Sequence, residues 1–337
     1  MNTLKITDRN RPLTERHDLE EAKIMEVKIL GERRRIYCPC NLNLVIDRRC
    51  NCDCGYCFFR GKKLRERVTD EEYLTRLEDV LKSLRGLPIE ITITGGEPTL
   101  CPERLIPVMR MVKEYGFSNR TFSTNGTGLL ERTEGKPLLQ YMKEYGCIYN
   151  INLSRMSAEE AENRRIFGGD TVGNRGIEQI AHFAEVNGMD LRLSCNLLEG
   201  AVDSWESVGR YMAFYRNLGV ASFVFREIIP KRESPSAFGR AAGEKAAGFS
   251  VSGGEGEGRA EHVSVSDIVE EMKKEREVQL LKTAHGVMYD VDIYGYESEL
   301  IKHYRGRPQT GAKGCAAGEE KLTTFLVYEE GELRTAW

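Results

Sequence analysis

The sequence lacks any apolar run near the roughly 20 residues that a membrane-spanning helix requires. Its first residues, from Met1 to Glu21, are charged and polar, and so they do not resemble a secretory signal. Neither sign of charge predominates, because the formal net charge is −3 over 337 residues. No global basic field is therefore present to attract nucleic acid. We expect a cytoplasmic protein that binds no membrane, and its charge disfavours a nucleic-acid partner.

Cysteine is too scarce for a disulfide framework, since ten cysteines are spread over 337 residues. Their distribution is uneven, however. In a reducing cytoplasm, a dense group of cysteines predicts metal binding rather than disulfide bonds. Six of the ten fall within twenty residues, namely Cys38, Cys40, Cys50, Cys52, Cys54 and Cys57.

Strand and helix patterns alternate along the middle of the chain. A buried strand is expected at 41–47, directly before the cysteine-rich loop. The residues Thr69-Asp-Glu-Glu72 predict the start of a helix, with Thr69 as its N-cap. This alternation predicts a parallel α/β sheet, either open or closed into a barrel, with ligands at the carboxyl ends of its strands. The other expected strands are 89–94, 121–123, 148–153, 191–196 and 222–228, and the other helices are 102–115, 138–145, 176–186 and 204–218.

The composition changes after Pro230. Residues 234–260 are rich in Gly, Ser and Ala, which predicts a flexible insertion. A charged helix is expected over 265–282, followed by strands at 287–294 and 322–328. We therefore divide the chain into four parts, which are an N-terminal extension (1–40), a core (41–230), a flexible insertion (231–264) and a C-terminal extension that covers the opening of the core (265–337).

The first chemical motif is the cysteine loop after the expected strand at 41–47. Cys50, Cys54 and Cys57 have the spacing C-x3-C-x2-C. Thiolates suit iron–sulfur clusters, and three of them can bind three irons of a cubane while the fourth iron stays open to a small molecule. The alternative is a zinc site, in which Cys38 and Cys40 would supply the second pair of ligands.

The second motif is Thr94-Gly95-Gly96-Glu97-Pro98-Thr99, at the end of the next expected strand. Two glycines let a ligand approach the backbone closely, Glu97 offers an acceptor, and Pro98 stiffens the turn. Together, the two motifs resemble the radical SAM superfamily, and the resemblance runs from Leu42 to about Pro230. The core is most similar to the GTP cyclase type of molybdenum cofactor biosynthesis.

This resemblance implies a partial (β/α)6 barrel of the TIM type with a C-terminal extension. It also implies a [4Fe-4S] cluster on Cys50, Cys54 and Cys57 that reductively cleaves S-adenosylmethionine. The resulting 5′-deoxyadenosyl radical abstracts a hydrogen atom from the substrate. The expected substrate is a peptide or a small metabolite, and the expected reductant is an electron donor such as flavodoxin or ferredoxin.

The resemblance further implies which residues bind S-adenosylmethionine. In this family the Gly-Gly-Glu-Pro segment contacts the methionine amino group, and Ser154 matches a position that binds the carboxylate or the ribose. One of the nearby arginines Arg155, Arg164 and Arg165 is expected to pair with that carboxylate, and Arg165 is the one assigned to it. For Asn125 an ordinary Asn-Gly turn, and for Arg226 a structural ion pair, are equally compatible with the sequence. The expected cofactor-binding residues are Tyr56, Gly95, Gly96, Glu97, Pro98, Ser123, Asn125, Ser154, Arg165, Ser194, Asn196 and Arg226.

One departure from the GTP cyclase type lies in the tail. That type carries a second cluster on three C-terminal cysteines, whereas this sequence has Cys315 alone in that region. A second cluster and GTP cyclisation are therefore not expected. Two alternatives stay open, which are a radical SAM enzyme that modifies RNA and a non-catalytic iron–sulfur or zinc-binding protein.

Overall fold

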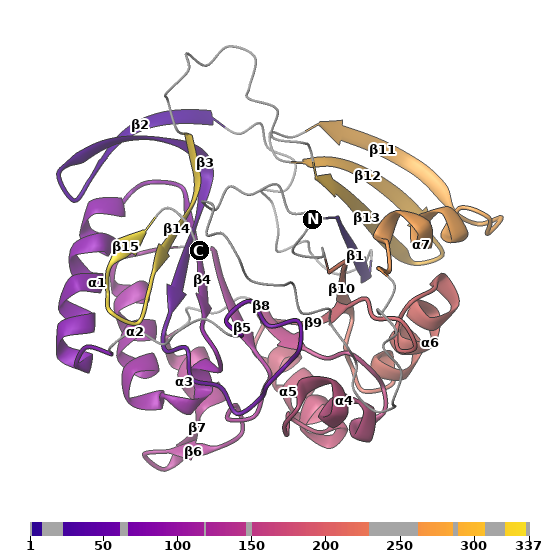
Figure 1. The fold of residues 1–337 in the computed structure, drawn as a ribbon, viewed down its shortest axis with the longest axis horizontal. Coiled ribbons are helices and arrows are strands. Elements are labelled where there is room, and N and C mark those ends of the chain that lie inside the picture. Colours follow the sequence, from indigo (N-terminus) through magenta and orange to yellow (C-terminus); the bar gives the residue numbers. More distant parts are fainter. Residues whose placement is uncertain are drawn as a thin grey trace, which may run out of the picture.

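Six parallel strands form the centre of the fold and lie side by side in the order of the sequence (Figure 1). The computed structural model describes residues 2–8, 23–60, 67–117, 119–145, 150–228, 262–285, 289–306 and 321–334. The six strands are β3 (Glu32–Val45), β4 (Ile89–Thr94), β5 (Asn119–Thr124), β8 (Asn150–Ser154), β9 (Asp190–Asn196) and β10 (Ser222–Arg226). Every neighbouring pair among them is parallel, and this arrangement confirms the predicted partial (β/α)6 barrel.

Helices cover the outer face of this curved sheet (Figure 1). They follow the strands along the chain, as right-handed crossovers require. A short 3-10 helix (Pro98–Leu100) lies between β4 and the second helix. The helices of the core are α1 (Asp70–Leu84), α2 (Pro102–Glu114), α3 (Leu138–Tyr145), α4 (Glu160–Phe167), α5 (Asn174–Val186) and α6 (Trp205–Arg216).

The two faces of the sheet differ in polarity because side chains alternate along each strand. Leu42, Ile91 and Phe122 point to the outer face and belong to the same buried cluster as the apolar sides of the helices. Their neighbours Asn43 and Thr92 point to the inner face. The inner face is therefore polar, and it is the surface that a ligand of the barrel would contact.

Additional strands extend the sheet on both sides (Figure 1). Next to β10 lies β1 (Thr3–Asp8), which is antiparallel to both β10 and β13. On the far side of the barrel, β14 (Lys321–Val327) runs parallel to β3. The remaining strands of the sheet are β2 (Lys23–Ile29), β11 (Gln279–His285), β12 (Tyr289–Tyr296), β13 (Glu299–Gly306) and β15 (Leu333–Arg334), and a separate hairpin is made of β6 (Arg132–Thr133) and β7 (Lys136–Pro137).

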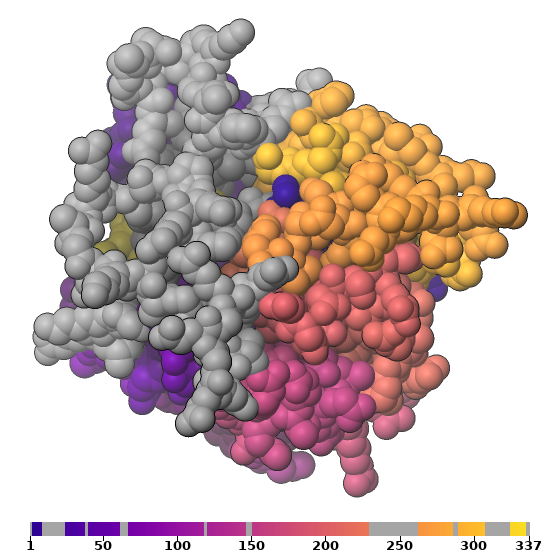
Figure 2. Space-filling model, turned by 45° about the vertical axis from the view of Figure 1, so that its right-hand side comes forward, coloured from indigo at the N-terminus to yellow at the C-terminus, as the bar shows by residue number. Residues whose placement is uncertain are grey.

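The segment after the core corrects one sequence-based expectation. The helix predicted over 265–282 ends at Met272, so α7 is Val265–Met272, and residues 279–285 form strand β11 instead. The helix ends there because the next five residues are all charged and offer no apolar side chain to bury. Figure 2 shows that this segment forms one continuous surface with the end of the core. Most of the predicted insertion at 231–264 lies outside the described residues, and the division into domains stays a prediction.

Other local predictions agree closely with the structure. Strand β4 and helix α3 have the predicted bounds, and Thr69 Oγ1 accepts a hydrogen bond from the backbone N of Glu72 at 3.2 Å, as an N-cap should. The sequence did not predict β1, β2, β13 or α4. None of the helices in the described ranges has both the length and the apolar character needed to span a bilayer.

His303 on β13 is buried between the sheet and α7. Its side chain is on the same face as Leu4 and Ile301, and neither ring nitrogen has a hydrogen-bond partner among the described residues. Burial lowers the pKa of His303 to about 4, against an ordinary value of 6.5. Charged side chains that influence it come from β12, β13, α7 and the end of β10, namely Asp292, Arg305, Lys273 and Glu227.

This histidine predicts a specific loss of stability in acid. Because its folded-state pKa lies below its unfolded value, its contribution is complete above pH 6.5 and is lost as the pH falls toward 4. At pH 5 the loss is expected to be about 2 kcal/mol relative to pH 7. His303→Leu should remove this part of the pH dependence, measured as the unfolding free energy in urea at both pH values. The same pH dependence in the variant and the wild-type protein would contradict the assignment.

Candidate active site

The cysteine loop begins where β3 ends and lies directly against the Gly-Gly-Glu segment after β4. Gly96 N donates to Asp47 O at 2.8 Å, and Glu97 N donates to Arg49 O at 2.9 Å. A β-carbon on Gly96 would lie 2.3 Å from Arg49 O, which is far inside van der Waals contact. A β-carbon on Gly95 would lie 2.3 Å from Asp47 O. The two sequence motifs are therefore one structural unit, and glycine is required so that the two backbones can touch.

The three cysteines with cluster spacing lie in a compact turn. Cys57 N donates to Cys54 O at 3.0 Å, and Cys54 and Cys57 are half-buried while Cys50 is exposed. Burial raises the pKa of Cys54 to about 11, and both Cys57 and Cys50 add to this increase. The three sulfurs are thus close enough to influence one another.

This donor set fits a cluster better than a single ion. Three thiols in one loop match the ligands of a cubane, which leaves one iron without a protein ligand. Cys38 and Cys40 lie in the middle of β3, whereas the loop with the three cysteines begins only after the end of this strand.

Cys52 lies inside the loop but makes different contacts from the three cysteines. Its sulfur accepts a hydrogen bond from Asn125 Nδ2 at 3.5 Å and is 3.8 Å from Asp170 O. A hydrogen bond from Cys52 also lowers the pKa of Cys50 to about 7. Cys52 therefore packs toward the loops after β5 and α4, which agrees with its position outside the ligand spacing.

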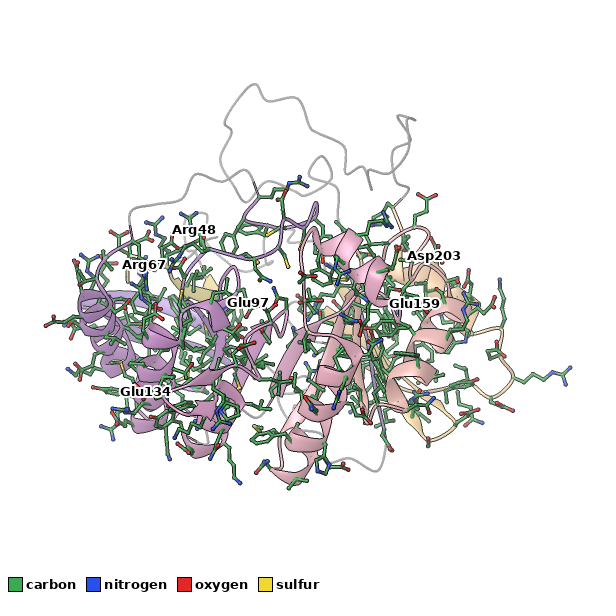
Figure 3. All side chains as sticks on the ribbon, turned by 90° about the horizontal axis from the view of Figure 1, so that it is seen from below. Arg48, Arg67, Glu97, Glu134, Glu159 and Asp203 are labelled. Atoms are coloured by element: carbon green, nitrogen blue, oxygen red, sulfur yellow. The ribbon has the colours of Figure 1, made fainter. Side chains whose placement is uncertain are left out.

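Glu97 fixes the junction between β4 and β5. Its carboxylate is fully buried, and Oε1 accepts from Thr99 N at 3.1 Å, Thr99 Oγ1 at 2.7 Å and Thr124 Oγ1 at 2.7 Å. Oε2 accepts from Asn125 N at 2.6 Å. Burial raises the pKa of Glu97. Figure 3 shows Glu97 in the interior of the molecule, whereas Glu134 lies at the periphery. The side chain shapes the site from beneath, since both its oxygens are already engaged.

Asn125 brings the loop after β5 into contact with the cysteine loop. Its Nδ2 donates to Asn51 Oδ1 at 2.9 Å, and Asn51 Nδ2 in turn donates to Asp170 O at 2.6 Å. Asn125 Oδ1 accepts from Thr127 N at 3.0 Å. The cysteine loop after β3, the loop after β5 and the connection after α4 are thereby tied together around the cysteines. Tyr56, also predicted, is buried beside Cys54 and packs edge-on against Phe167, with ring centroids 6.4 Å apart.

The other predicted residues lie on the strands opposite the cysteine loop. Ser154 is in register with Ser194, and Arg226 donates a hydrogen bond to Ser194 Oγ. Asn196 at the end of β9 is in register with Arg226 at the end of β10. Ser123 lies on β5, the strand next to β8 on the side toward β4. The structure therefore brings these polar side chains to the inner face of the barrel.

Arg165 is the predicted residue that the structure does not bring to this face. It lies on the exposed side of α4, and its guanidinium pairs with Glu162 of the same helix at 2.5 Å. Arg155, directly after Ser154, is fully buried and donates to Tyr215 Oη at 2.8 Å and to Val172 O at 2.9 Å. Neither arginine is available at the strand ends, because each is used in packing or pairing elsewhere.

Three cations on the inner face were not predicted, namely Lys5, Arg192 and Lys302. Lys5 of β1 is in register with Val224 of β10 and with Lys302 of β13, so all three side chains share one face with Ser194. Lys302 is buried, with 4% of its surface exposed, and Lys5 Nζ lies 4.5 Å from the ring centroid of Tyr304. The alternation of Leu4 and Ile6 around Lys5 was the signal that could have identified this strand.

The inner face is positively charged on this side of the barrel. Along β9, β10, β1 and β13, its inward positions carry Arg192, Arg226, Lys5 and Lys302. The same positions carry one carboxylate, Asp190, at 3.9 Å from Arg192. These inward positions thus carry four basic side chains and one acidic side chain. Such a surface favours an anionic ligand.

Part of the core of the chain matches a known protein family. Residues 44–196 match the Radical SAM superfamily. Curated relatives include a GTP 3′,8-cyclase of Aquifex aeolicus, which is 27% identical over 185 residues that cover 53% of each chain. An S-adenosylmethionine-dependent nucleotide dehydratase of Fibrobacter is 25% identical over 234 residues, which cover 58% of this chain and 66% of the relative. The chain spans about half the length of the first of these relatives.

The solved structures that match are more distant in sequence. SuiB of Streptococcus suis bound to S-adenosylmethionine matches with a TM-score of 0.42 and 18% identity, covering 55% of this chain and 40% of that one. The enzyme anSMEcpe with bound AdoMet matches with a TM-score of 0.43 and 18% identity, covering 59% and 54%. The superfamily match itself confirms the predicted radical SAM recognition and, with it, the family's two cofactors, a [4Fe-4S] cluster and S-adenosylmethionine.

The contact between the two motifs predicts the effect of adding one methyl group. Gly96→Ala should destabilise the protein by about 1–3 kcal/mol and reduce the iron bound after reconstitution, because the new β-carbon meets backbone that cannot move aside cheaply. Gly209→Ala in α6 is the matched control, since its β-carbon would meet nothing within 4 Å and alanine favours a helix. Urea unfolding and iron analysis measure the two effects. Equal behaviour of the two variants would refute the role given to Gly96.

Proposed function

We infer that this chain, whose residues 44–196 form a radical SAM domain, is an enzyme that holds a [4Fe-4S] cluster on Cys50, Cys54 and Cys57. The observation that carries this proposal is the joining of the cysteine loop to Gly95 and Gly96 by backbone contact. When bound, the cluster supplies the electron that cleaves S-adenosylmethionine and so generates the 5′-deoxyadenosyl radical. Flavodoxin or ferredoxin is the kind of donor we propose for that electron.

The chain's own residues prepare a polar site around these cofactors. Tyr56 closes the loop on its buried side, and the glycines give a ligand access to the backbone after β4. Ser154, Ser194 and Asn196 present hydroxyl and amide groups at neighbouring strand ends, where they can bind polar atoms of S-adenosylmethionine. Glu97 and Asn125 are assigned mainly to holding the loops in place, because their hydrogen bonds run within the protein.

The proposed substrate is a small, anionic, nucleotide-type metabolite rather than a peptide. The names of two relatives, a GTP cyclase and a nucleotide dehydratase, refer to nucleotide substrates. The positive inner face supports the same class, because Lys302 and Lys5 are placed to attract phosphate groups and Arg226 can bind them in a bidentate manner. GTP cyclisation is not part of the proposal, since the sequence does not offer three cysteines in its tail.

The catalytic part of the proposal predicts formation of 5′-deoxyadenosine. The protein is reconstituted anaerobically with iron and sulfide, reduced with dithionite and given S-adenosylmethionine, and the product is measured by chromatography. We expect about four irons per chain and product from the wild-type protein. Cys54→Ala should bind less iron and yield at least about 100-fold less 5′-deoxyadenosine than the wild-type protein, because one iron loses its thiolate ligand.

Cys52→Ser is the matched control for this experiment. It changes a cysteine of the same loop that lies outside the ligand spacing, so iron and product should stay near wild-type amounts. A wild-type protein with a complete cluster that yields no 5′-deoxyadenosine would refute the catalytic proposal. Zinc with little iron in the protein as purified would instead support a zinc-binding protein.

The substrate class predicts a separate effect on nucleotide binding. Lys302→Gln should weaken the binding of a nucleoside triphosphate by about 10–100-fold, because a hydrogen bond to a charged group is worth about 1.5–3 kcal/mol. Calorimetric titration with GTP, CTP and ATP measures this effect. Lys282→Gln on the exposed strand β11 is the control and should leave the affinity unchanged. Equal binding by both variants, or no binding of any nucleotide by the wild-type protein, would contradict a nucleotide substrate.

A further inference from the structure

The turn after β14 packs beside the start of the cysteine loop. The side chains of Glu329 in this turn and Arg48 in the loop form an ion pair, and each side chain is only 4% exposed. The two residues are 281 positions apart in the sequence. Among the described residues, the second carboxylate oxygen of Glu329 is buried without a hydrogen-bond donor.

Arg104 of α2 reinforces this junction from beneath. Its side chain is fully buried, and Nη1 donates to both Ile46 O at 3.1 Å and Glu329 O at 3.0 Å. The same guanidinium donates to Val68 O at 2.7 Å and pairs with Asp70 at 2.6 Å. One arginine thus joins the end of β3, the C-terminal turn and the start of α1.

A third arginine holds the next residue of the turn. Arg76 of α1 donates to Glu330 O at 2.7 Å. A β-carbon on Gly331 would lie 3.0 Å from the Arg76 side chain, so the turn fits closely against the helix. The turn is therefore fixed independently of its pair with Arg48, which makes it a firm support for that arginine.

Arg48 is also the point at which the glycine motif touches the loop. The carbonyl oxygen of Arg48 lies 2.4 Å from the β-carbon position of Gly96, and the next residue accepts a hydrogen bond from Glu97 N. Cys50 follows two positions later and is exposed. The backbone that leads to Cys50 is thus held on one side by the glycines and on the other by Glu329.

We propose that Glu329 is a positioning residue for the cysteine loop, acting through Arg48. Its buried carboxylate fixes the guanidinium, and the guanidinium fixes the backbone immediately before Cys50. Breaking a buried ion pair by removing one member is strongly destabilising, so the loop should open when Glu329 is neutralised. The positioning role of Glu329 depends on the proposed function in one respect, namely that Cys50 is a cluster ligand.

The experiment compares two glutamates of the same C-terminal segment. Glu329→Gln is expected to speed hydrogen exchange in the peptide that spans residues 44–52 by about tenfold or more in the metal-free protein, because the loop loses its support. Glu332→Gln is the matched control, since Glu332 forms an exposed pair with Arg334. Peptides from β8 and β9 serve as the internal reference. After reconstitution, Glu329→Gln should also release iron to a chelator about tenfold faster than Glu332→Gln.

Arg48→Lys provides a second variant in case Glu329→Gln does not fold. It keeps a positive charge near Glu329 but loses the guanidinium, so exchange in residues 44–52 should increase by a smaller factor. Unchanged exchange in these residues would overturn the proposal. An equal increase in β8 and β9 would also overturn it, because the pair would then support the whole fold rather than the loop. If Glu329→Gln speeds exchange in residues 44–52 but the wild-type protein binds no iron, the proposed function is refuted and the positioning role of Glu329 is not.

Discussion

The contact between two stretches of backbone determines the form of this site. Asp47 and Arg49 lie against Gly95 and Gly96 without any side chain between them. Because the loop is held in this way, Asn51 and Cys52 reach the loop after β5, where Asn125 binds both. The same contact places three thiols at the carboxyl edge of the parallel strands, which is the edge where ligands of such sheets bind.

Local signals were enough to predict most of the barrel but not its surroundings. The N-cap at Thr69 and the apolar period after it depend on neighbours three or four residues away, so the sequence alone placed helix α1 correctly. Strand β1 was missed because its local signal is only the short alternation of Leu4 and Ile6 around Lys5, and its place in the sheet depends on pairing with the distant strands β10 and β13. Arg165 was assigned by proximity in sequence, yet helical geometry turns it toward Glu162 and away from the strand ends. The role of Glu329 depends on a partner 281 residues away, which no local pattern can indicate.

The radical SAM segment and its flanks contribute different parts of the site. The cysteine loop, the glycine motif and the hydroxyl groups of Ser154 and Ser194 all lie within residues 44–196. The cations Lys5, Arg226 and Lys302 lie outside that segment. The residues proposed to bind the cofactors thus lie within the segment that matches the superfamily, while the cations proposed to bind the substrate lie on β1, β10 and β13, outside it. Variation in those strands could change the substrate without disturbing the cofactors.

The way in which β1 and β14 enter the sheet has a consequence for folding. Asn2 binds Glu227 across 225 residues, and the pair of Arg48 with Glu329 spans 281. Contacts of such long sequence separation raise the contact order, and proteins of high contact order fold slowly because the chain loses much entropy before these contacts form. The helices can form early, since their contacts are local. We therefore expect the cysteine loop to reach its final shape late, when distant segments have found their places, and the proposed cluster to assemble after that step.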